Sequence, residues 1–289
     1  MTLEDSYRYC ASITRAAAKN FYYTFWLLPL AKRRAIYAVY TFSRRVDDIV
    51  DNAAAKDDAT ECETGLRRMK SILNPGPLAD DPLAPALQDT LQRYRIPAIY
   101  FDELIEGMKM DLVRKRYQNF DDLRLYCYRA ASTIGLISIQ IFGHDGEASA
   151  VEKPAIDMGL AMQLTNIIRD VGEDLSRDRI YLPQDEMKRF EVTEEDLKRL
   201  QATEPIKALL KFQIERAREY FQRAEPLFSH LHADARFCPV LLKRFYSELL
   251  DQVEARHYDV FTRRPRLSTL RKITLAGNTW LRAKIVKTQ

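Results

Sequence analysis

The segment Leu160–Asp174, with the sequence LAMQLTNIIRDVGED, decides the fold. Its apolar residues recur at intervals of three and four, as in the run from Leu160 through Leu164 to Ile168, which is the period of an α-helix with one buried face. The same spacing recurs along nearly the whole sequence, whereas convincing strand alternation is absent. Only 9 glycines and 12 prolines interrupt it. The sequence therefore predicts an all-α fold.

The predicted helices form a bundle that surrounds a central space, because they are numerous and several are long. A helix over residues 21–52, with a break at Pro29, continues as a polar helix over residues 53–70. The segment 74–85, NPGPLADDPLAP, holds four prolines and is predicted to be a loop. No internal repeat is visible, and residues 1–289 are expected to form a single domain. Further helices are predicted at residues 98–114, 121–142, 150–174, 193–200, 203–230, 236–261 and 268–285.

The composition limits the classes of partner. Lys and Arg number 45 against 41 Asp and Glu, and these charges alternate along the chain, so nucleic acid is not expected as a partner. The four cysteines include no C-x-x-C pair, and the N-terminus lacks the pattern of a signal peptide. A cytoplasmic location with reduced thiols is therefore expected.

Two apolar segments bear on membrane association. Ala130–Gly143 is the longest apolar stretch and is too short for a bilayer span of about 20 residues. Leu270–Lys287 mixes apolar with basic residues, including Trp280 and Arg271, and this pattern is typical of a helix that lies on a membrane surface. We expect peripheral membrane contact through this C-terminal segment; an ordinary docked terminal helix is the alternative.

A first pair of carboxylates is formed by Asp47 and Asp51, which lie four residues apart and therefore on one face of the predicted helix, with Asp48 beside them. Like charges repel each other there unless a cation binds. Mg²⁺ is usually held by one or two carboxylates together with substrate phosphate oxygens. Arg44, one turn before Asp48, could donate to such a phosphate. A solvated acidic turn balanced by Arg44 and Arg45 is the structural alternative.

A second pair, Asp170 and Asp174, lies on the helix predicted for residues 150–174. Asn166 precedes Asp170 by four residues, so three oxygen-bearing side chains line one helix face, with Glu173 beside them. A mixed-charge surface helix is the alternative, but the apolar residues of this helix favour burial. Three arginines that could donate to an anion surround the pair: Arg169, Arg177 and Arg179.

Two such centres suit a reaction in which two diphosphates are bound and ionised. Metal ions and arginines neutralise the charge that develops on a leaving diphosphate, so that the carbon–oxygen bond can break to give an allylic cation. The cation needs a dry, aromatic-lined cavity, because water would quench it and π faces stabilise it. The 15 tyrosines and 13 phenylalanines can supply such a lining, although most must be ordinary core.

These motifs resemble those of the squalene/phytoene synthases, the head-to-head members of the trans-isoprenyl diphosphate synthases. The resemblance covers nearly the whole chain, and its most specific part is residues 163–183, QLTNIIRDVGEDLSRDRIYLP. It implies a single-domain helical bundle of the isoprenoid-synthase type around a central apolar cavity. The other segments that carry it are Asn20–Tyr23 (NFYY), Leu27–Pro29 (LLP), Tyr40–Asp51 (YTFSRRVDDIVD), Gly107–Leu112 (GMKMDL) and Tyr126–Ala131 (YCYRAA).

The resemblance also implies roles for individual residues. Two to three Mg²⁺ ions and two prenyl diphosphates would be held by Asp47, Asp51, Asp170 and Asp174 with Asn166, assisted by Arg44 and Arg169. The four aspartates would act in catalysis together with Tyr126 and Arg179. The site would further be lined by Tyr40, Gln163, Tyr246 and Arg263, with Asp111 as a cavity aspartate on the intervening helix.

Within the family, the chain most resembles bacterial presqualene diphosphate synthases, which join two farnesyl diphosphates, on the evidence of Asn20–Tyr23 and Ile141–Gly143. The alternative is a phytoene synthase, which joins two geranylgeranyl diphosphates and shares the Asp-Val-Gly-Glu-Asp motif. Neither activity requires NADPH, and no Gly-rich dinucleotide loop is present. One departure is Ala17–Lys19, where many members have serine; Lys19 is a candidate substitute for its phosphate contact.

Two further interpretations stay open. A non-catalytic binding or assembly protein of the same fold would have eroded aspartates, and here all four are intact. A terpene cyclase that uses one diphosphate would need an NSE-type metal motif, whose spacing Asn166–Asp170 does not supply. For the favoured interpretation we expect a monomer or weak dimer that binds two prenyl diphosphates.

Overall fold

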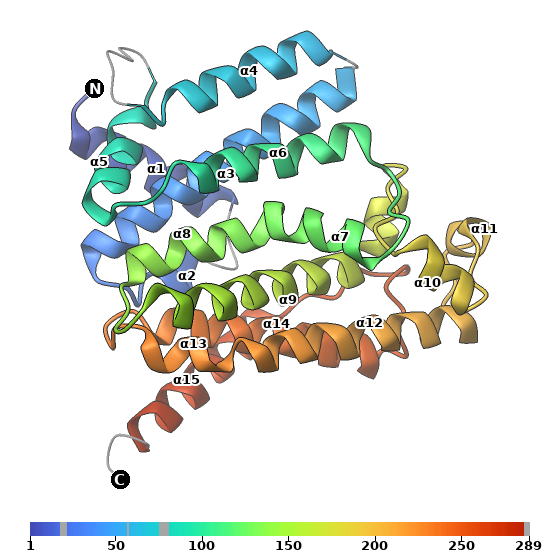
Figure 1. The fold of residues 1–289 in the computed structure, drawn as a ribbon. Helices are drawn as coiled ribbons and strands as arrows, with labels where there is room; N and C mark the ends of the chain where they lie inside the picture. Colours follow the sequence, from blue (N-terminus) through green and yellow to red (C-terminus); the bar gives the residue numbers. More distant parts are fainter. Residues whose placement is uncertain (18–21, 57, 75–80, 286–289) are drawn as a thin grey trace.

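The computed structural model describes residues 1–17, 22–56, 58–74 and 81–285 (Figure 1). Within these ranges the chain is helical, with two isolated bridges, Arg116–Ile180 and His144–Leu231, in place of strands. The all-α prediction is confirmed. The helices are α1 Leu3–Ala17, α2 Tyr22–Phe25, α3 Leu30–Lys56, α4 Ala59–Ser71, α5 Ala84–Tyr94, α6 Ile99–Val113, α7 Phe120–Cys127, the π-helix η1 Tyr128–Ser132, α8 Thr133–Phe142, α9 Ala148–Leu175, α10 Gln184–Arg189, α11 Glu194–Lys198, α12 Glu204–Arg223, α13 Glu225–His230, α14 Phe237–Ala255 and α15 Thr269–Ile285.

Helix α9 lies at the centre of the bundle. Figure 1 shows α4, α6, α8, α9 and α12 as rows that run roughly side by side, and α9 packs against α8, η1, α12, α13 and α14. Burial therefore extends along most of its length, from Val151 to Val171. This position explains why the apolar period of the segment is so clear, and it places the second aspartate pair on an interior helix.

Two glycines allow α6 and α9 to approach the π-helical turn η1 closely. A Cβ atom at Gly159 of α9 would lie 2.4 Å from the Cα of Ser132, and one at Gly107 of α6 would lie 2.7 Å from the Cβ of Arg129. Any larger side chain at either position would force the helices apart. The π-helical turn begins two residues after Tyr126, and such turns occur frequently at functional sites.

A cavity of about 260 Å³ lies inside the bundle, between α3, α8, α9 and α14. Most of its wall is apolar, as expected for a site that holds a hydrocarbon chain. Polar groups enter the lining on α3 and α9 one turn before each aspartate pair, at Ser43 and at Asn166. Its apolar lining includes Phe25, Ile36, Val39, Ile134, Ile139, Phe142, Met158, Met162, Leu227, Leu231 and Leu242.

The predicted helix boundaries need three corrections. The polar continuation over residues 53–70 is wrong, because α3 ends at Lys56 and Asp58 caps a new helix, accepting a hydrogen bond from the backbone N of Glu61 at 2.8 Å. The helix predicted for 203–230 is divided at Ala224, before Pro226 in the first turn of α13. Helix α14 ends at Ala255 instead of residue 261.

Three helices, α1, α5 and α10, were not predicted at all. Helix α5 begins within the proline-rich segment, where Pro85 occupies a first-turn position that needs no backbone N–H. Helix α1 packs against α3 and α5 through one side that includes Tyr7 and Cys10. The four cysteines are all buried free thiols.

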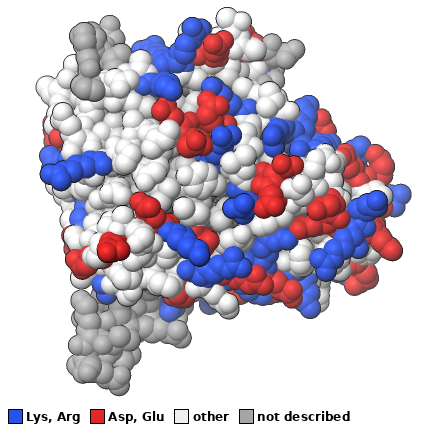
Figure 2. Space-filling model, viewed as in Figure 1, with Lys and Arg blue, Asp and Glu red and all other residues white. Residues whose placement is uncertain are grey.

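Charged side chains of both signs are interleaved on the face shown in Figure 2, and neither sign gathers into one broad patch there. Among the described residues, no helix combines the length and the apolar character needed to cross a bilayer.

Candidate active site

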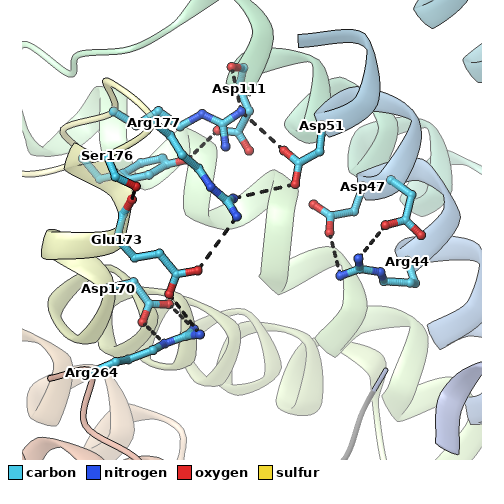
Figure 3. A network of polar contacts seen from close by, with 12 residues as sticks. Arg44, Asp47, Asp51, Asp111, Asp170, Glu173, Ser176, Arg177 and Arg264 are labelled. Carbon is cyan, nitrogen blue, oxygen red and sulfur yellow. Dashed lines mark hydrogen bonds and ion pairs between the residues drawn. The ribbon is translucent and has the colours of Figure 1, made fainter. Parts of the chain in front are cut away.

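The first aspartate pair projects from α3 toward α9 (Figure 3). The Arg44 guanidinium lies 3.4 Å from Asp47 Oδ2 and 2.5 Å from Asp48 Oδ1. Burial, followed by the charge of the neighbouring Asp51, raises the pKa of Asp47 to about 6. The pair is therefore a place where negative charge is unfavourable until a cation arrives.

The second aspartate pair is divided between two electrostatic environments. Asp170 accepts two hydrogen bonds from Arg169, at 2.7 and 2.6 Å, and two from Arg264, at 2.7 and 2.8 Å. Burial acts to raise the pKa of Asp170, but these arginines outweigh it and hold the pKa below its ordinary value. Asp174 differs: burial, followed by the charge of Asp170, raises its pKa to about 8.

Arginines join the two pairs across the space between α3 and α9 (Figure 3). Arg179 and Arg177 lie 3.5 and 3.7 Å from the Asp51 carboxylate. Arg177 also lies 3.8 Å from Glu173, on the second aspartate helix. The carboxylates of both helices and the arginines between them thus form one polar site.

Asp111 lies beside both pairs, on α6, and accepts hydrogen bonds from two tyrosines. Tyr181 Oη donates to it at 2.7 Å and Tyr126 Oη at 3.1 Å. The Tyr181 ring stacks on those of Tyr126 and Tyr117, which are tilted against each other, and the centroids lie 5.1 to 5.6 Å apart. Burial raises the pKa of Asp111, although the two hydroxyl groups and Arg179 counteract it.

Four of the residues predicted for the site line the cavity: Tyr40, Gln163, Asn166 and Tyr246. Asn166 Nδ2 donates to Gln163 Oε1 at 3.2 Å, which orients both amides. Six more of the predicted residues meet at the polar site next to the cavity: Asp47, Asp51, Asp111, Asp170, Asp174 and Arg179.

Arg263 is not placed in that polar site, since its side chain is exposed, whereas the adjacent Arg264 reaches Asp170 and Glu173. Tyr181 and Arg264 are the site residues that sequence reasoning missed. Tyr181 lies within the segment 163–183, and Arg264 follows the predicted Arg263, but neither shares a helical period with the aspartates. The prediction for Lys19 lies outside the described residues, as do Asn20 and Phe21.

The donor set fits a divalent cation that brings part of its own coordination. Among the described residues, no group of three or more acidic, histidine or cysteine side chains is gathered closely enough to hold a metal by itself. Instead, two carboxylate pairs face each other from α3 and α9, and burial and the neighbouring carboxylates raise the pKa values of Asp47 and Asp174 more than the nearby arginines lower them. Hard oxygen ligands in this number suit Mg²⁺ that is shared with a phosphate group.

An all-α bundle with two facing aspartate helices at the end of an apolar cavity defines a class, the isoprenoid-synthase-type enzymes. A family model described as squalene/phytoene synthase matches residues 14–271. The 15-cis-phytoene synthase of Synechocystis sp. is 40% identical over 296 residues, which cover 99% of this chain and 87% of that protein.

Solved structures agree with this match. A dehydrosqualene synthase in complex with ligand superposes with a TM-score of 0.88 at 32% identity, over 98% of both chains. The squalene synthase HpnC from Alicyclobacillus acidocaldarius superposes with a TM-score of 0.81 at 25% identity, over 89% of this chain and 96% of that one. The chain belongs to the squalene/phytoene synthase family, and it is a prenyltransferase that condenses two prenyl diphosphates head to head.

Proposed function

We propose that this enzyme joins two geranylgeranyl diphosphates into the C40 hydrocarbon phytoene. The observation that carries the choice of substrate is the 40% identity, over 99% of the chain, to a protein named 15-cis-phytoene synthase; a phytoene synthase of Arthrospira platensis is 39% identical over the same share. This choice replaces the farnesyl preference suggested by Asn20–Tyr23 and Ile141–Gly143; Asn20 and Phe21 lie outside the described ranges.

We assign Mg²⁺ binding to Asp47 and Asp51 on one helix and to Asp170 and Asp174 with Asn166 on the other. Two observations support this assignment: the two aspartate pairs face each other, and the pKa values of Asp47 and Asp174 are raised, so that a bound cation would stabilise their charged forms. When bound, the metal supplies positive charge that stabilises the diphosphate as it leaves. The aspartates hold that charge at the polar end of the cavity.

We assign the diphosphates themselves to the arginines of the polar site. Arg169, Arg179 and Arg264 each lie within hydrogen-bond or ion-pair distance of an aspartate of the site. Guanidinium groups bind phosphate oxygens in pairs, so these side chains can exchange a carboxylate for a diphosphate. Arg44, beside the first pair, is the equivalent donor on α3, and Arg263 remains a proposal without a contact at the site.

The hydrocarbon chains are held by the cavity, which excludes water from the allylic cation. Tyr40 and Tyr246 stand in its wall near the aspartates and present aromatic rings that stabilise positive charge. Tyr126, hydrogen bonded to Asp111, is the neighbouring group that we assign to catalysis. Joining two C20 chains to phytoene releases two diphosphates and two protons, so the balance needs no reductant and NADPH is not required.

A second candidate is the C30 reaction, which uses two farnesyl diphosphates. It is favoured by the structural match to a dehydrosqualene synthase, with a TM-score of 0.88, and includes the presqualene diphosphate product that the sequence motifs suggested. Purified enzyme should be incubated with Mg²⁺ and either substrate, without NADPH, and the products extracted. A larger kcat/KM for geranylgeranyl diphosphate and a C40 product are expected; a preference for farnesyl diphosphate would reverse the assignment.

We further propose that α15 contacts a membrane surface. This helix carries four apolar side chains that are 50 to 75% exposed: Leu270, Ile273, Trp280 and Leu281. The C40 product proposed for the enzyme is insoluble in water, so release into a membrane would suit it. The test is sedimentation with vesicles that contain anionic lipid. Binding should fall when Leu270 and Ile273 are both replaced by aspartate, and equal binding by that variant would exclude this surface.

A further inference from the structure

Arg116 lies in the loop between α6 and α7, outside the cavity lining, and its guanidinium donates five hydrogen bonds. Nε and Nη2 donate to the Glu194 carboxylate at 2.7 and 2.9 Å, and Nη2 also donates to the Asp178 carboxylate at 2.9 Å. Nη1 donates to the backbone carbonyls of Asp178 and Lys115 at 2.7 and 2.9 Å. An arginine has five N–H donors, so this side chain is fully engaged.

The contacts with Asp178 fall on the turn that ends α9. The backbone N of Asp178 donates to the carbonyl of Leu175 at 3.0 Å, and that of Arg179 donates to the carbonyl of Asp174 at 2.9 Å. This pair of bonds is a Schellman motif, whose left-handed position usually holds glycine. Here Asp178 occupies it with a φ of 55°. The left-handed conformation is less favourable for aspartate than for glycine, and Arg116 holds it by binding both the carbonyl and the carboxylate of Asp178.

Arg179 follows this turn directly and enters the polar site. Its side chain is only 11% exposed, and Nη2 lies 3.5 Å from Asp51 Oδ1 and 3.4 Å from the carbonyl oxygen of Asp111. Because the direction of its Cα–Cβ bond depends on the backbone of Asp178, a change in that turn would withdraw the guanidinium from Asp51.

The segment after Arg179 is attached to the same loop. The backbone N of Ile180 donates to the carbonyl of Lys115 at 2.9 Å, and that of Gln184 donates to the carbonyl of Tyr117 at 2.9 Å. Arg116 therefore stands at the start of a short pairing between the loop and the chain that leaves the second aspartate helix. Its side chain binds Asp178, the residue in the left-handed conformation at this end of the pairing.

We propose that Arg116 is a positioning residue, which sets Arg179 in the diphosphate site by fixing the left-handed turn at Asp178. The assignment rests on the proposed function, in which Arg179 binds diphosphate. Arg116 does not contact the diphosphate itself, because all five of its donors are used by Glu194, Asp178 and the carbonyl of Lys115, outside the cavity. Lysine would not replace it, because an ammonium presents three donors from a single point.

The test is a double-mutant cycle between Arg116→Ala and Arg179→Ala, read out as the dissociation constant of inorganic pyrophosphate at saturating Mg²⁺. Each single variant should weaken binding about 10- to 100-fold, the range found when groups that orient ligands are removed. The double variant should bind no more than about 2-fold more weakly than Arg179→Ala alone, because coupled residues are not additive. Losses that multiply, or unchanged binding by Arg116→Ala, would overturn the proposal.

A matched control separates positioning from stability. Arg218 binds Asp251 and Glu254 in a similar charged network between α12 and α14, away from the site. Arg218→Ala should lower Tm but leave pyrophosphate binding unchanged, and an equal loss of binding in this control would refute a specific role for Arg116. If Arg116→Ala does not fold, Arg116→Lys takes its place in the same cycle and should show the same loss of binding, because an ammonium cannot hold both the carbonyl and the carboxylate of Asp178.

The wild-type product assay distinguishes this inference from the proposed function. If the cycle shows that Arg116 and Arg179 are coupled in pyrophosphate binding, but the wild-type enzyme yields no hydrocarbon made of two prenyl chains, the proposed function alone is contradicted. If the wild-type enzyme yields that hydrocarbon, but the cycle shows no coupling between Arg116 and Arg179, the role of Arg116 alone is contradicted.

Discussion

Asp170 and Arg264 are joined by two hydrogen bonds of 2.7 and 2.8 Å, although 94 residues separate them in sequence. Arg264 also reaches Glu173 at 3.1 Å, so the loop between α14 and α15 is tied across the second aspartate helix. The same oxygens of Asp170 that we assign to metal binding are therefore neutralised by an arginine. This pair must loosen when metal and diphosphate bind.

Replacing Arg264 by alanine should have opposite effects on the two ligands. Without diphosphate, Mg²⁺ should bind more tightly because Asp170 loses a competing partner. Pyrophosphate in the presence of Mg²⁺ should bind roughly 10-fold or more weakly, the scale of one charged hydrogen bond of about 1.5–3 kcal/mol. Calorimetric titration measures both. If neither affinity changes, Arg264 is a structural residue only.

Asp47→Asn and Asp174→Asn should each lower kcat/KM by at least about 100-fold, since each removes a charge that stabilises the transition state. The helical circular dichroism spectrum and Tm should stay close to those of the wild type, because burial disfavours the charged form of both side chains and a neutral amide fits the same place. Asp121→Asn, an exposed aspartate on α7 with 84% side-chain exposure, is the matched control and should retain full activity. Wild-type rates in either site variant would invalidate the metal assignment.

The pKa of Asp174, raised to about 8, predicts how the stability of the metal-free enzyme changes with pH. The folded state holds the proton more tightly than the unfolded chain, in which the pKa is near 3.8. The contribution of this group to stability is therefore complete below about pH 4 and is lost as the pH rises through about 8. Asp174→Asn should flatten this part of the Tm profile, and saturating Mg²⁺ should do the same in the wild type.

If the Tm of Asp174→Asn changed with pH in the same way as that of the metal-free wild type does from about pH 5 to about pH 8, Asp174 would not be the group that causes the loss of stability. Asp170→Asn supplies the contrast. Arginines hold the pKa of Asp170 low, so its charge stabilises the folded protein at neutral pH. Asp170→Asn should therefore lower Tm at neutral pH.

Ser138 on α8 lines the cavity beyond the polar site, in the helix that ends at Phe142. Ser138→Phe should fill part of that space and shorten the chain that fits. We expect the ratio of kcat/KM for geranylgeranyl to farnesyl diphosphate to fall by about 10-fold or more, because an overfilled pocket rejects the longer chain. Product analysis with both substrates checks this. An unchanged ratio would place the limit on chain length elsewhere.

The helices that carry the aspartates were predictable because their signal is local. Spacing of four residues places Asp47 with Asp51 and Asp170 with Asp174 on one helix face whatever the rest of the chain does. The apolar period of α9 likewise reports burial directly. These two helices supply the carboxylates of the site.

Other parts of the site depend on contacts between distant segments, which no sequence window contains. Arg263 and Arg264 are equivalent in sequence, and only the path of the loop over α9 brings Arg264 to Asp170. Tyr181 reaches Asp111 because the chain after Arg179 pairs with the loop at Lys115. Both contacts arise from tertiary structure.

Helix ends were less predictable than helices, since the deciding groups are ambiguous in sequence. Asp58 reads equally well as one more polar residue of a long helix, yet it caps α4. His257 and Tyr258 take left-handed conformations that end α14, and nothing in their side chains demands this. The length of the prenyl substrate could not be predicted for a related reason: the wall of the cavity is formed by helices that are far apart in sequence.

The central claim, that the two aspartate helices ionise two prenyl diphosphates, is tested most directly by the stoichiometry of one reaction. Purified enzyme, Mg²⁺ and geranylgeranyl diphosphate are incubated without NADPH, and released diphosphate is counted against extracted hydrocarbon. We predict two diphosphates for each C40 hydrocarbon. A product that contains a single prenyl chain, with one diphosphate released for each, or no coupled product from either geranylgeranyl or farnesyl diphosphate, would contradict the account.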